Sequence, residues 1–313
     1  MTSKPRGLKK TANRSSSGAL PTTRRVDVLI IGAGPSGLSA AIKLKEQGIT
    51  DVLVLDRASR IGGTWAMNDY PGLRCDVPSE LYSLGYAPNP NWSRTYAPQA
   101  EIRQYLDDLA HHFGVADKIQ LNTEVVNAQW MEADTCWVAT TAAKERFVAR
   151  VLVAAPGFIG EPEEPSFPGQ DKFKGTIFHS AKWNYDHDLT GERVAVIGCG
   201  ASAIQFLPAI QPKVKKLISF QRTPAWVLPK PDVAMPKAVS RLFARLPALQ
   251  TGICEAGLAG LETSLLVFMH EKLLRAITHP LGRFNINRSV TDPGMRRQLT
   301  PTFTLGCKRP LFS

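Results

Sequence analysis

Two glycine-rich turns have the residue types and spacing that point most directly to chemistry. The first follows the apolar run Val26–Ile31 and places Gly32, Gly34 and Gly37 in a Gly-x-Gly-x-x-Gly pattern. Glycine permits a tight strand-to-helix turn, close approach of the backbone to a pyrophosphate, and close packing of helix on strand. The helix that begins here offers free N–H groups and its positive dipole end to phosphate oxygens. This turn predicts a dinucleotide site.

The residues after the first turn complete the pattern. Ser36 lies within the turn, a helix-period stretch runs to Gly48, and Val52–Leu55 is a second strand that ends at Asp56. An acid about twenty residues beyond the last glycine is placed to hold ribose hydroxyls. Strand, turn, helix, strand and acid in this order favour dinucleotide binding over an unrelated glycine-rich turn.

A second turn of the same kind follows the strand Val194–Ile197. It contains Gly198, Gly200, Ala201 and Ser202 and ends in Ala203, so it reads Gly-x-Gly-x-x-Ala, which the dinucleotide motif allows. Two such turns in one chain, each in the correct context, predict two dinucleotide cofactors.

The two turns differ in the residues that would recognise the ribose. The strand Lys216–Phe220 leads to Arg222 and Thr223 instead of an acid. A guanidinium binds a 2′-phosphate through two parallel hydrogen bonds, whereas a carboxylate would repel it. The second turn therefore favours NADPH, and the first, with Asp56, favours FAD. Two cofactors that exchange hydride predict an oxidoreductase.

Composition excludes several other classes of protein. The formal net charge is +11, but residues 1–25 carry seven Lys/Arg and no acid, and the remainder has 31 basic and 27 acidic residues. The excess comes largely from a polar tail that we expect to be disordered, and a folded basic face for nucleic acid is not indicated. The most apolar stretch, Ala256–His270, is interrupted by Gly257, Gly260 and Glu262 and is too short to span a membrane.

The five cysteines are scattered, odd in number and without a Cys-x-x-Cys pair. This distribution indicates a reducing compartment, and we expect a cytoplasmic protein. It also argues against structural zinc and against a disulfide redox centre. Adjacent His111 and His112 cannot share a helix face, so we expect no metal site.

The rest of the chain positions the two turns. The patterns predict a loop over Ile61–Pro78, a helix over Gln99–Phe113 and a linker over Glu161–Gly169. Short strands are predicted from Gln120, Gln129, Cys136 and Arg146. They would form a β-meander, inserted before the parallel sheet resumes with a strand over Val151–Ala155. Further predictions are helices over Val239–Leu246 and Leu258–Ile277 and a turn at Thr291–Gly294. The fold class is α/β, with two Rossmann-like dinucleotide-binding domains, a small β-meander and a helical insert. We expect a tail over 1–25, an FAD domain over 26–162, an NADP domain over 163–230, a helical insert over 231–300 and a return toward the NADP domain over 301–313.

Between the two turns the sequence becomes specific for one family. Phe173, Gly175, His179 and Trp183 form a Phe-x-Gly-x-x-x-His-x-x-x-Trp pattern. This pattern resembles the fingerprint of Baeyer–Villiger monooxygenases, the class B flavoprotein monooxygenases. Further matching stretches are Gly62–Trp65, Tyr70–Asp76, Phe220–Pro224 and Gly306–Arg309, so the resemblance runs from about residue 25 to the end.

The resemblance implies an NADPH-dependent enzyme that inserts one oxygen of O₂ beside a ketone carbonyl through a C4a-peroxyflavin, giving an ester or lactone. It places the active-site arginine at Arg309, with Asp76 as the residue that pairs with it and tunes it. A fixed cation of this kind would stabilise the negative charge on the activated oxygen. Lys308 would join Arg222 and Thr223 on the 2′-phosphate. The remaining cofactor residues that it implies are Gly63, Thr64, Trp65, Tyr82 and Val125, while His179 and Trp183 would couple the linker to NADP(H) movement.

The sequence departs from the family at two places. Pro156 stands where relatives have Ser or Thr, beside a flavin contact. Relatives also continue for well over a hundred residues past Gly306–Arg309, so we expect a C-terminally truncated member. Two alternatives stay open: a sibling flavin monooxygenase that oxygenates nitrogen or sulfur, against which Trp183 argues, and an inactive remnant. The ketone itself is not specified.

Overall fold

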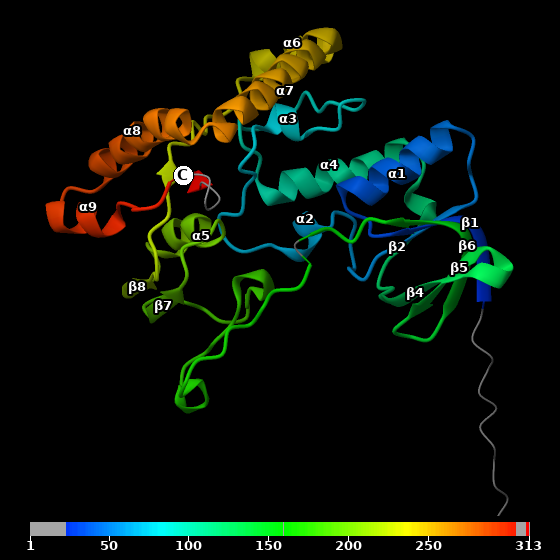
Figure 1. The fold of residues 1–313 in the computed structure, drawn as a ribbon, viewed down its shortest axis with the longest axis horizontal. Helices are drawn as coiled ribbons and strands as arrows, with labels where there is room; N and C mark the ends of the chain where they lie inside the picture. The colour runs from blue at the N-terminus through cyan, green and yellow to red at the C-terminus, as the bar shows by residue number, and fades with distance from the viewer. Residues whose placement is uncertain (1–22, 159, 305–310, 313) are drawn as a thin grey trace, which may run out of the picture.

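The computed structural model describes residues 23–158, 160–304 and 311–312. Its largest element is a six-stranded sheet with the order β3-β2-β1-β6-β5-β4 (Figure 1). The strands of this sheet are β1 (Thr23–Ile31), β2 (Val52–Leu55), β3 (Ile119–Gln120), β4 (Val125–Met131), β5 (Cys136–Thr141) and β6 (Arg146–Ala154). β3, β2, β1 and β6 are parallel neighbours, and β5 and β4 are antiparallel additions. The predicted α/β class is confirmed.

Two helices cover one face of the parallel part of this sheet, α1 (Pro35–Glu46) and α4 (Gln99–His112) (Figure 1). The apolar residues of α4 recur at helical spacing, and Ile102, Leu106 and Leu109 are buried against α1 and the strands. The helix predicted over Gln99–Phe113 is therefore confirmed. Short helices α2 (Thr64–Met67) and α3 (Ser79–Tyr82) lie in the long connection between β2 and α4.

The predicted β-meander, β4, β5 and β6, is not a separate insertion, because its strands belong to the same six-stranded sheet as β1, β2 and β3. β6 is one continuous strand that pairs with β5 along Arg146–Ala149 and with β1 as far as Ala154. The strands expected from Arg146 and over Val151–Ala155 are thus a single strand, because no turn residue interrupts the run between them.

The boundary predicted for the N-terminal tail is wrong by three residues. Thr23, Arg24 and Arg25 belong to β1 and pair with Arg146, Phe147 and Val148 of β6. Their side chains are exposed, and the pairing uses backbone groups, so polarity alone does not exclude a strand here. Residues 1–22, for which disorder is predicted, lie outside the described residues.

A smaller unit follows the proline-rich segment 161–169, which contains no helix or strand in the structure. β7 (Arg193–Ile197) and β8 (Lys216–Phe220) form a parallel pair connected by α5 (Ala203–Ile210). β9 (Val227–Leu228) then pairs in parallel with β10 (Leu311–Phe312) near the end of the chain. This strand–turn–helix–strand order is the one that the second glycine turn predicts.

Four helices separate β9 from β10: α6 (Lys237–Arg245), α7 (Pro247–Met269), α8 (Glu271–Ser289) and α9 (Pro293–Leu299). The helix predicted over Leu258–Ile277 is wrong as a single element, because His270 adopts an extended conformation between α7 and α8. The turn predicted at Thr291–Gly294 is a helix start instead. Asp292 caps α9 by accepting from the Met295 N–H, and Pro293 occupies the first helical position.

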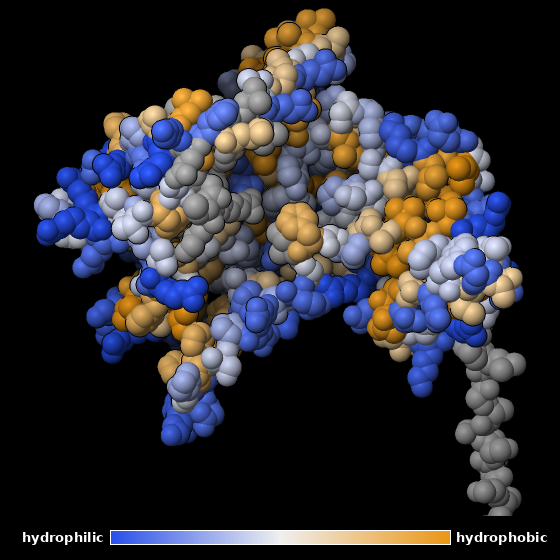
Figure 2. Space-filling view, in the orientation of Figure 1, coloured by the Kyte–Doolittle hydropathy of each residue, from blue (hydrophilic) through white to orange (hydrophobic). Residues whose placement is uncertain are grey.

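The helical insert contacts both parts of the molecule. α7 packs on α3, where Gln250 is fully buried, and α8 packs on β9 around Trp226. Figure 2 shows apolar surface at the top of the view, over α6 and α7. Leu242 of α6, Ile253 of α7 and Leu246 between the two helices are exposed. Within the described residues, no helix is both long enough and apolar enough to cross a membrane.

Candidate functional site

The first glycine turn, Gly32–Gly37, is called the first cradle. It leaves β1 with Gly32 at φ +107°, and a Cβ on Gly32 would lie 2.2 Å from the Ala155 carbonyl oxygen. A Cβ on Gly37 would lie 1.8 Å from the Gly32 carbonyl oxygen. Both glycines are therefore required by close backbone approach, as the motif predicts. α1 begins here without a side-chain N-cap, so its first N–H groups remain available to an anion.

A second glycine loop closes over the first cradle. Gly63 has φ +56°, and a Cβ on it would lie 2.9 Å from the Gly34 Cα. Only residues without side chains permit this approach of the two backbones. Asp56 fixes the same region, because its carboxylate accepts from the N–H groups of Ala33 at 2.6 Å and Ala58 at 2.7 Å. The predicted ribose-binding acid thus lies at the first cradle.

Trp65 and Tyr82 form an aromatic pair beside this loop. Trp65 is buried, its Nε1 donates to the Tyr82 hydroxyl at 2.9 Å, and the two rings meet edge to face. Burial raises the pKa of Tyr82, and the bond from Trp65 partly offsets this. Ser36 and Thr64 are exposed at the starts of α1 and α2.

The second glycine turn, Gly198–Ala203, is called the second cradle. Gly198 has φ +114°, yet a Cβ on Gly198 or on Gly200 would meet no atom of the described residues within 4 Å. Ala201 and Ser202 are half-buried before α5 begins at Ala203. The cradle opens toward the end of β8, where the Cys199 thiol donates to the Thr223 carbonyl at 3.3 Å.

Arg222 is exposed beside Thr223 at this strand end. Its guanidinium has no hydrogen-bond or ion-pair partner among the described residues. The predicted 2′-phosphate recognition residue therefore lies at the second cradle with its charge available.

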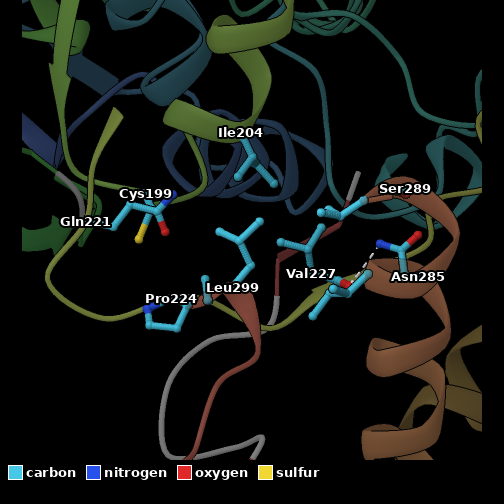
Figure 3. A pocket seen from close by; sticks show the side chains of 11 residues that line it. Cys199, Ile204, Gln221, Pro224, Val227, Asn285, Ser289 and Leu299 are labelled. Carbon is cyan, nitrogen blue, oxygen red and sulfur yellow. Dashed lines mark hydrogen bonds between the residues drawn. The ribbon is translucent and has the colours of Figure 1, made fainter. Parts of the chain in front are cut away.

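A pocket of about 400 Å³ adjoins the second cradle (Figure 3). It is lined by Cys199, Ile204, Gln221, Pro224, Ala225, Val227, Asn285, Ile286, Ser289, Val290 and Leu299. Asn285 holds one wall by donating to the Val227 carbonyl at 3.0 Å. The residues from α8 and α9 were not predicted as site residues, because apolar spacing in a helix does not show which surface the helix will cover.

One segment, Gly62–Asp76, touches both cradles. Gly63 meets Gly34 at its beginning, as described above. Near its end, the Tyr70 hydroxyl donates to Gln205 Oε1 of α5 at 3.2 Å. Burial raises the pKa of Tyr70, a hydrogen bond with Ser202 lowers it, and the negative charge of Asp76 raises it. The charge of the predicted catalytic acid, Asp76, thus acts on the pKa of both Tyr70 and Tyr82.

The fingerprint residues form a loop structure of their own. The ring of Phe173 covers Gly175, where a Cβ would lie 2.6 Å from the ring. His179 accepts from the Ala181 N–H through Nδ1 at 3.1 Å, and Trp183 packs on Phe206 of α5 at 5.3 Å between ring centroids. Through Trp183, the fingerprint thus contacts α5, the helix that follows the second cradle.

Three predicted site residues are not brought into this arrangement by the described contacts. Val125 begins β4 and packs against the Val26–Leu29 side of the sheet, on the opposite face from α1. Lys308 and Arg309 lie outside the described residues.

Comparison with known proteins agrees with this geometry. A family model described as pyridine nucleotide-disulphide oxidoreductase matches residues 29–233, which include both cradles. The chain belongs to this family. Among the described cysteines of this family member, Cys75, Cys136, Cys199 and Cys254 are free thiols.

Curated relatives confirm the resemblance read from the motifs. The chain is 44% identical over 297 residues to a Baeyer–Villiger monooxygenase of Streptomyces coelicolor, covering 92% of this chain and 55% of the relative. It is 42% identical over 291 residues to a Baeyer–Villiger monooxygenase of Pseudomonas aeruginosa, covering 93% and 55%. The chain thus spans about 55% of the length of these relatives.

Solved structures show the same fold. A steroid monooxygenase bound to NADP superposes with a TM-score of 0.80 at 30% identity, covering 92% of this chain and 62% of that one. A cyclohexanone monooxygenase from Rhodococcus sp. Phi1 bound to NADP⁺ superposes with a TM-score of 0.80 at 29% identity, covering 93% and 62%.

Proposed function

We propose that this protein is an NADPH-dependent FAD monooxygenase that inserts one oxygen of O₂ next to a ketone carbonyl, forming an ester or lactone. The observation that carries the proposal is the segment Gly62–Asp76. It contacts the first cradle through Gly63 and, through Tyr70, contacts Gln205 of α5, the helix that begins at the second cradle. Two cofactor cradles linked by one short segment suit hydride transfer between two cofactors. The names of the relatives, Baeyer–Villiger and cyclohexanone monooxygenase, support the ketone as substrate class.

The first cradle fits FAD. Gly32, Gly34 and Gly63 leave no side chain between the backbone and a pyrophosphate, and the uncapped start of α1 supplies N–H donors. Asp56 is held at the cradle by two backbone bonds and retains lone pairs for ribose hydroxyls. The Trp65–Tyr82 pair offers an apolar wall nearby.

The second cradle fits NADPH. A Cβ on Gly198 or Gly200 would meet none of the described residues within 4 Å, and the adjoining pocket of about 400 Å³ is lined mostly by apolar side chains. Arg222 provides a guanidinium at the end of β8 with its donors available, which suits a 2′-phosphate. Thr223 and Lys308 would complete that contact.

Bound FAD, reduced by NADPH, would supply the activated oxygen that no protein side chain can provide. Arg309 would stabilise negative charge that develops on the oxygen and on the substrate carbonyl. Asp76, whose charge acts on the pKa of Tyr70 and Tyr82, would hold the guanidinium of Arg309 in position. His179 and Trp183 would transmit movement of the linker to the second cradle through Phe206.

We also propose that the chain divides functionally as the motifs predict, with FAD bound within 26–162, NADPH within 163–230, and a helical insert over 231–300. The thiols of Cys75, Cys136, Cys199 and Cys254 are free, which supports a reducing compartment, and we propose the cytoplasm.

The test is oxygen consumption and product analysis with the purified, FAD-loaded protein, NADPH, and either a cyclic ketone or a thioether. Ketone-dependent formation of an ester or lactone supports the proposal, whereas sulfoxide formation alone favours the sibling class. Arg309→Ala should retain reduction of FAD by NADPH but lose ester formation by at least a hundredfold. Arg146→Ala, which removes an exposed arginine at the far end of β6, is the matched control and should retain activity. Unchanged ester yield in Arg309→Ala would remove the role assigned to Arg309.

A further inference from the structure

The segment that follows β9 is tied into the part of the molecule that carries the first cradle. The Thr95 N–H donates to the Val233 carbonyl at 3.0 Å, and the Met235 N–H donates to the Ser93 carbonyl at 2.8 Å. The Val233 N–H donates in return to the Thr95 hydroxyl at 3.0 Å. These bonds join residues about 140 positions apart in the sequence. They hold the segment against Ser93 and Thr95, in the connection between β2 and α4.

Asp232 lies at the centre of this junction. Its side chain accepts from Arg74 and, at 3.0 and 3.1 Å, from Arg94 Nε, while its carbonyl accepts from Arg94 Nη2 at 3.2 Å. The Asp232 side chain is 17% exposed, against 38% for Arg74 and 34% for Arg94. An exposed ion pair contributes little to stability. Here one largely covered carboxylate is shared by two guanidiniums and makes several charge-assisted hydrogen bonds, which are stronger than neutral ones.

Two more residues from beyond position 200 hold the backbone next to Arg74. Gln205 Oε1 accepts from the Arg74 N–H at 3.2 Å, and Gln205 Nε2 donates to the Arg74 carbonyl at 3.0 Å. Lys230 Nζ donates to the Cys75 carbonyl at 2.8 Å and lies 4.7 Å from the centroid of the Tyr96 ring. Burial lowers the pKa of Lys230, and the charge of Asp232 raises it.

These contacts account for three of the four backbone N–H and C=O groups of Arg74 and Cys75. The N–H and C=O of Arg74 and the C=O of Cys75 all bond to side chains that follow the second cradle. The Cys75 N–H bonds instead to the Ala97 carbonyl at 3.0 Å, within the first part of the molecule. The backbone immediately before Asp76 is therefore held from both sides.

We propose that Gln205, Lys230 and Asp232 are positioning residues, which place Asp76 between the two cradles and make its position depend on how the second cradle is docked. The inference rests on the proposed function, because Asp76 matters catalytically only if the protein oxygenates a substrate. Productive geometry at such a site tolerates only sub-ångström displacements. A junction made by the second part of the molecule on the residues next to Asp76 couples that geometry to NADP(H) binding.

The first test measures amide hydrogen exchange over residues 70–76, with and without NADP⁺. The variants are Asp232→Asn, Asp232→Ala and Gln205→Ala, with Asp232→Glu as the rescue. Asp171→Ala, at an exposed acid, is the matched control. We expect NADP⁺ to slow exchange over 70–76 in the unaltered protein. Asp232→Ala and Gln205→Ala should each speed exchange over 70–76 about tenfold and should abolish the slowing by NADP⁺. Asp232→Asn should lie between them, and Asp232→Glu should restore part of the protection.

The second test uses the FAD-loaded protein. Asp232→Ala should leave the KM for NADPH within about twofold, lower the kcat for ester formation about tenfold, and raise the fraction of O₂ released as hydrogen peroxide, because NADPH still binds while Asp76 is displaced. A residue with a merely structural role would lower FAD content and melting temperature without this split between kcat and KM.

The outcomes separate the two proposals. Unchanged exchange over 70–76 in both Asp232→Ala and Gln205→Ala would overturn the positioning role, whatever the activity. Faster exchange throughout the molecule together with loss of FAD in Asp232→Asn would also overturn it. Local loss of NADP⁺-dependent protection in a protein that forms no ester would support the junction as the coupling element and overturn the proposed function.

Discussion

The two cradles have almost the same sequence pattern but differ in how tightly they are packed. Gly32 and Gly198 have nearly the same backbone conformation, with φ +107° and +114°. A Cβ on Gly32 would lie 2.2 Å from a carbonyl oxygen, whereas a Cβ on Gly198 would meet nothing within 4 Å in the part of the chain that the structure describes. The motif therefore determines the turn, and the surroundings determine whether the turn is also a close contact.

The surroundings differ because of strand neighbours. β1 lies between β2 and β6, and its residues Leu29 and Ile30 are fully buried. In the part of the chain that the structure describes, β7 pairs only with β8, and Ile197 and Phe220 are 62% and 54% exposed. The first cradle is therefore an integral part of a hydrophobic core, while the second is an open turn on a narrow two-stranded sheet.

The largest expected effect comes from adding a methyl group to each cradle. Gly32→Ala should destabilise the protein by about 4 kcal/mol or more and abolish FAD retention, because strain at positive φ adds to a backbone clash. Gly198→Ala should cost only about 1 kcal/mol, from strain alone, and should keep FAD. Thermal unfolding and the flavin spectrum of the two purified variants check this.

Equal destabilisation by Gly32→Ala and Gly198→Ala would contradict the contrast between the cradles. It would mean that the second cradle is packed as closely in solution as the first. Gly48→Ala, at a glycine with φ +80° where a Cβ would meet none of the described residues within 4 Å, is a control for strain alone outside both cradles.

The next effect concerns the strands that lead into the cradles. Ile30→Ala should cost about 2–5 kcal/mol, because Ile30 is fully buried and its truncation leaves a cavity. Ile197→Ala should cost less than about 0.5 kcal/mol, because its side chain is largely exposed. Denaturant unfolding measures both, and a cost above 1 kcal/mol for Ile197→Ala would show that its exposed face is covered in the protein.

The first part of the fold could be predicted well from the sequence because local and long-range signals agree there. The run before Gly32 is β-branched and apolar, the residues of α4 recur at helical spacing, and each pattern buries the face that it predicts. The roles of Gly32 and Gly37 follow from the motif, and the structure supplies the close contacts that require them.

The rest could not be predicted because it depends on contacts between distant segments. Nothing local in α8 indicates that Asn285 and Ser289 would line a pocket with Cys199. The pairing of Asp232 with Arg74 and Arg94 joins residues more than 130 positions apart. The break at His270 was missed because the apolar pattern continues across it.

A smaller effect tests the chemistry that the open second cradle offers. Arg222→Ala should weaken NADPH binding about 10–30-fold while changing NADH binding less than twofold, because only NADPH has the 2′-phosphate. Fluorescence titration with both nucleotides measures this. Arg193→Ala, at an exposed arginine at the start of β7, is the matched control. An equal loss for both nucleotides would show that Arg222 supports the cradle instead of reading the phosphate.

The smallest effect concerns the anchoring of the helical insert to the first part of the molecule. Burial raises the pKa of Glu80, and the bond from Gln250 Nε2 to its carboxylate at 2.6 Å lowers it only partly. The folded state therefore binds the Glu80 proton more tightly than the unfolded state does, so this carboxyl lowers stability as the pH rises above its ordinary range near 4.5. Glu80→Gln should raise the melting temperature by about 1 °C at pH 7.5, with solvent screening limiting the gain. The difference should shrink as the pH falls and disappear by about pH 3, well below the ordinary pKa near 4.5. Glu255→Gln, at an exposed acid of α7, should show no such pH dependence. A gain for Glu80→Gln that persists at about pH 3 would assign the effect to packing instead of charge.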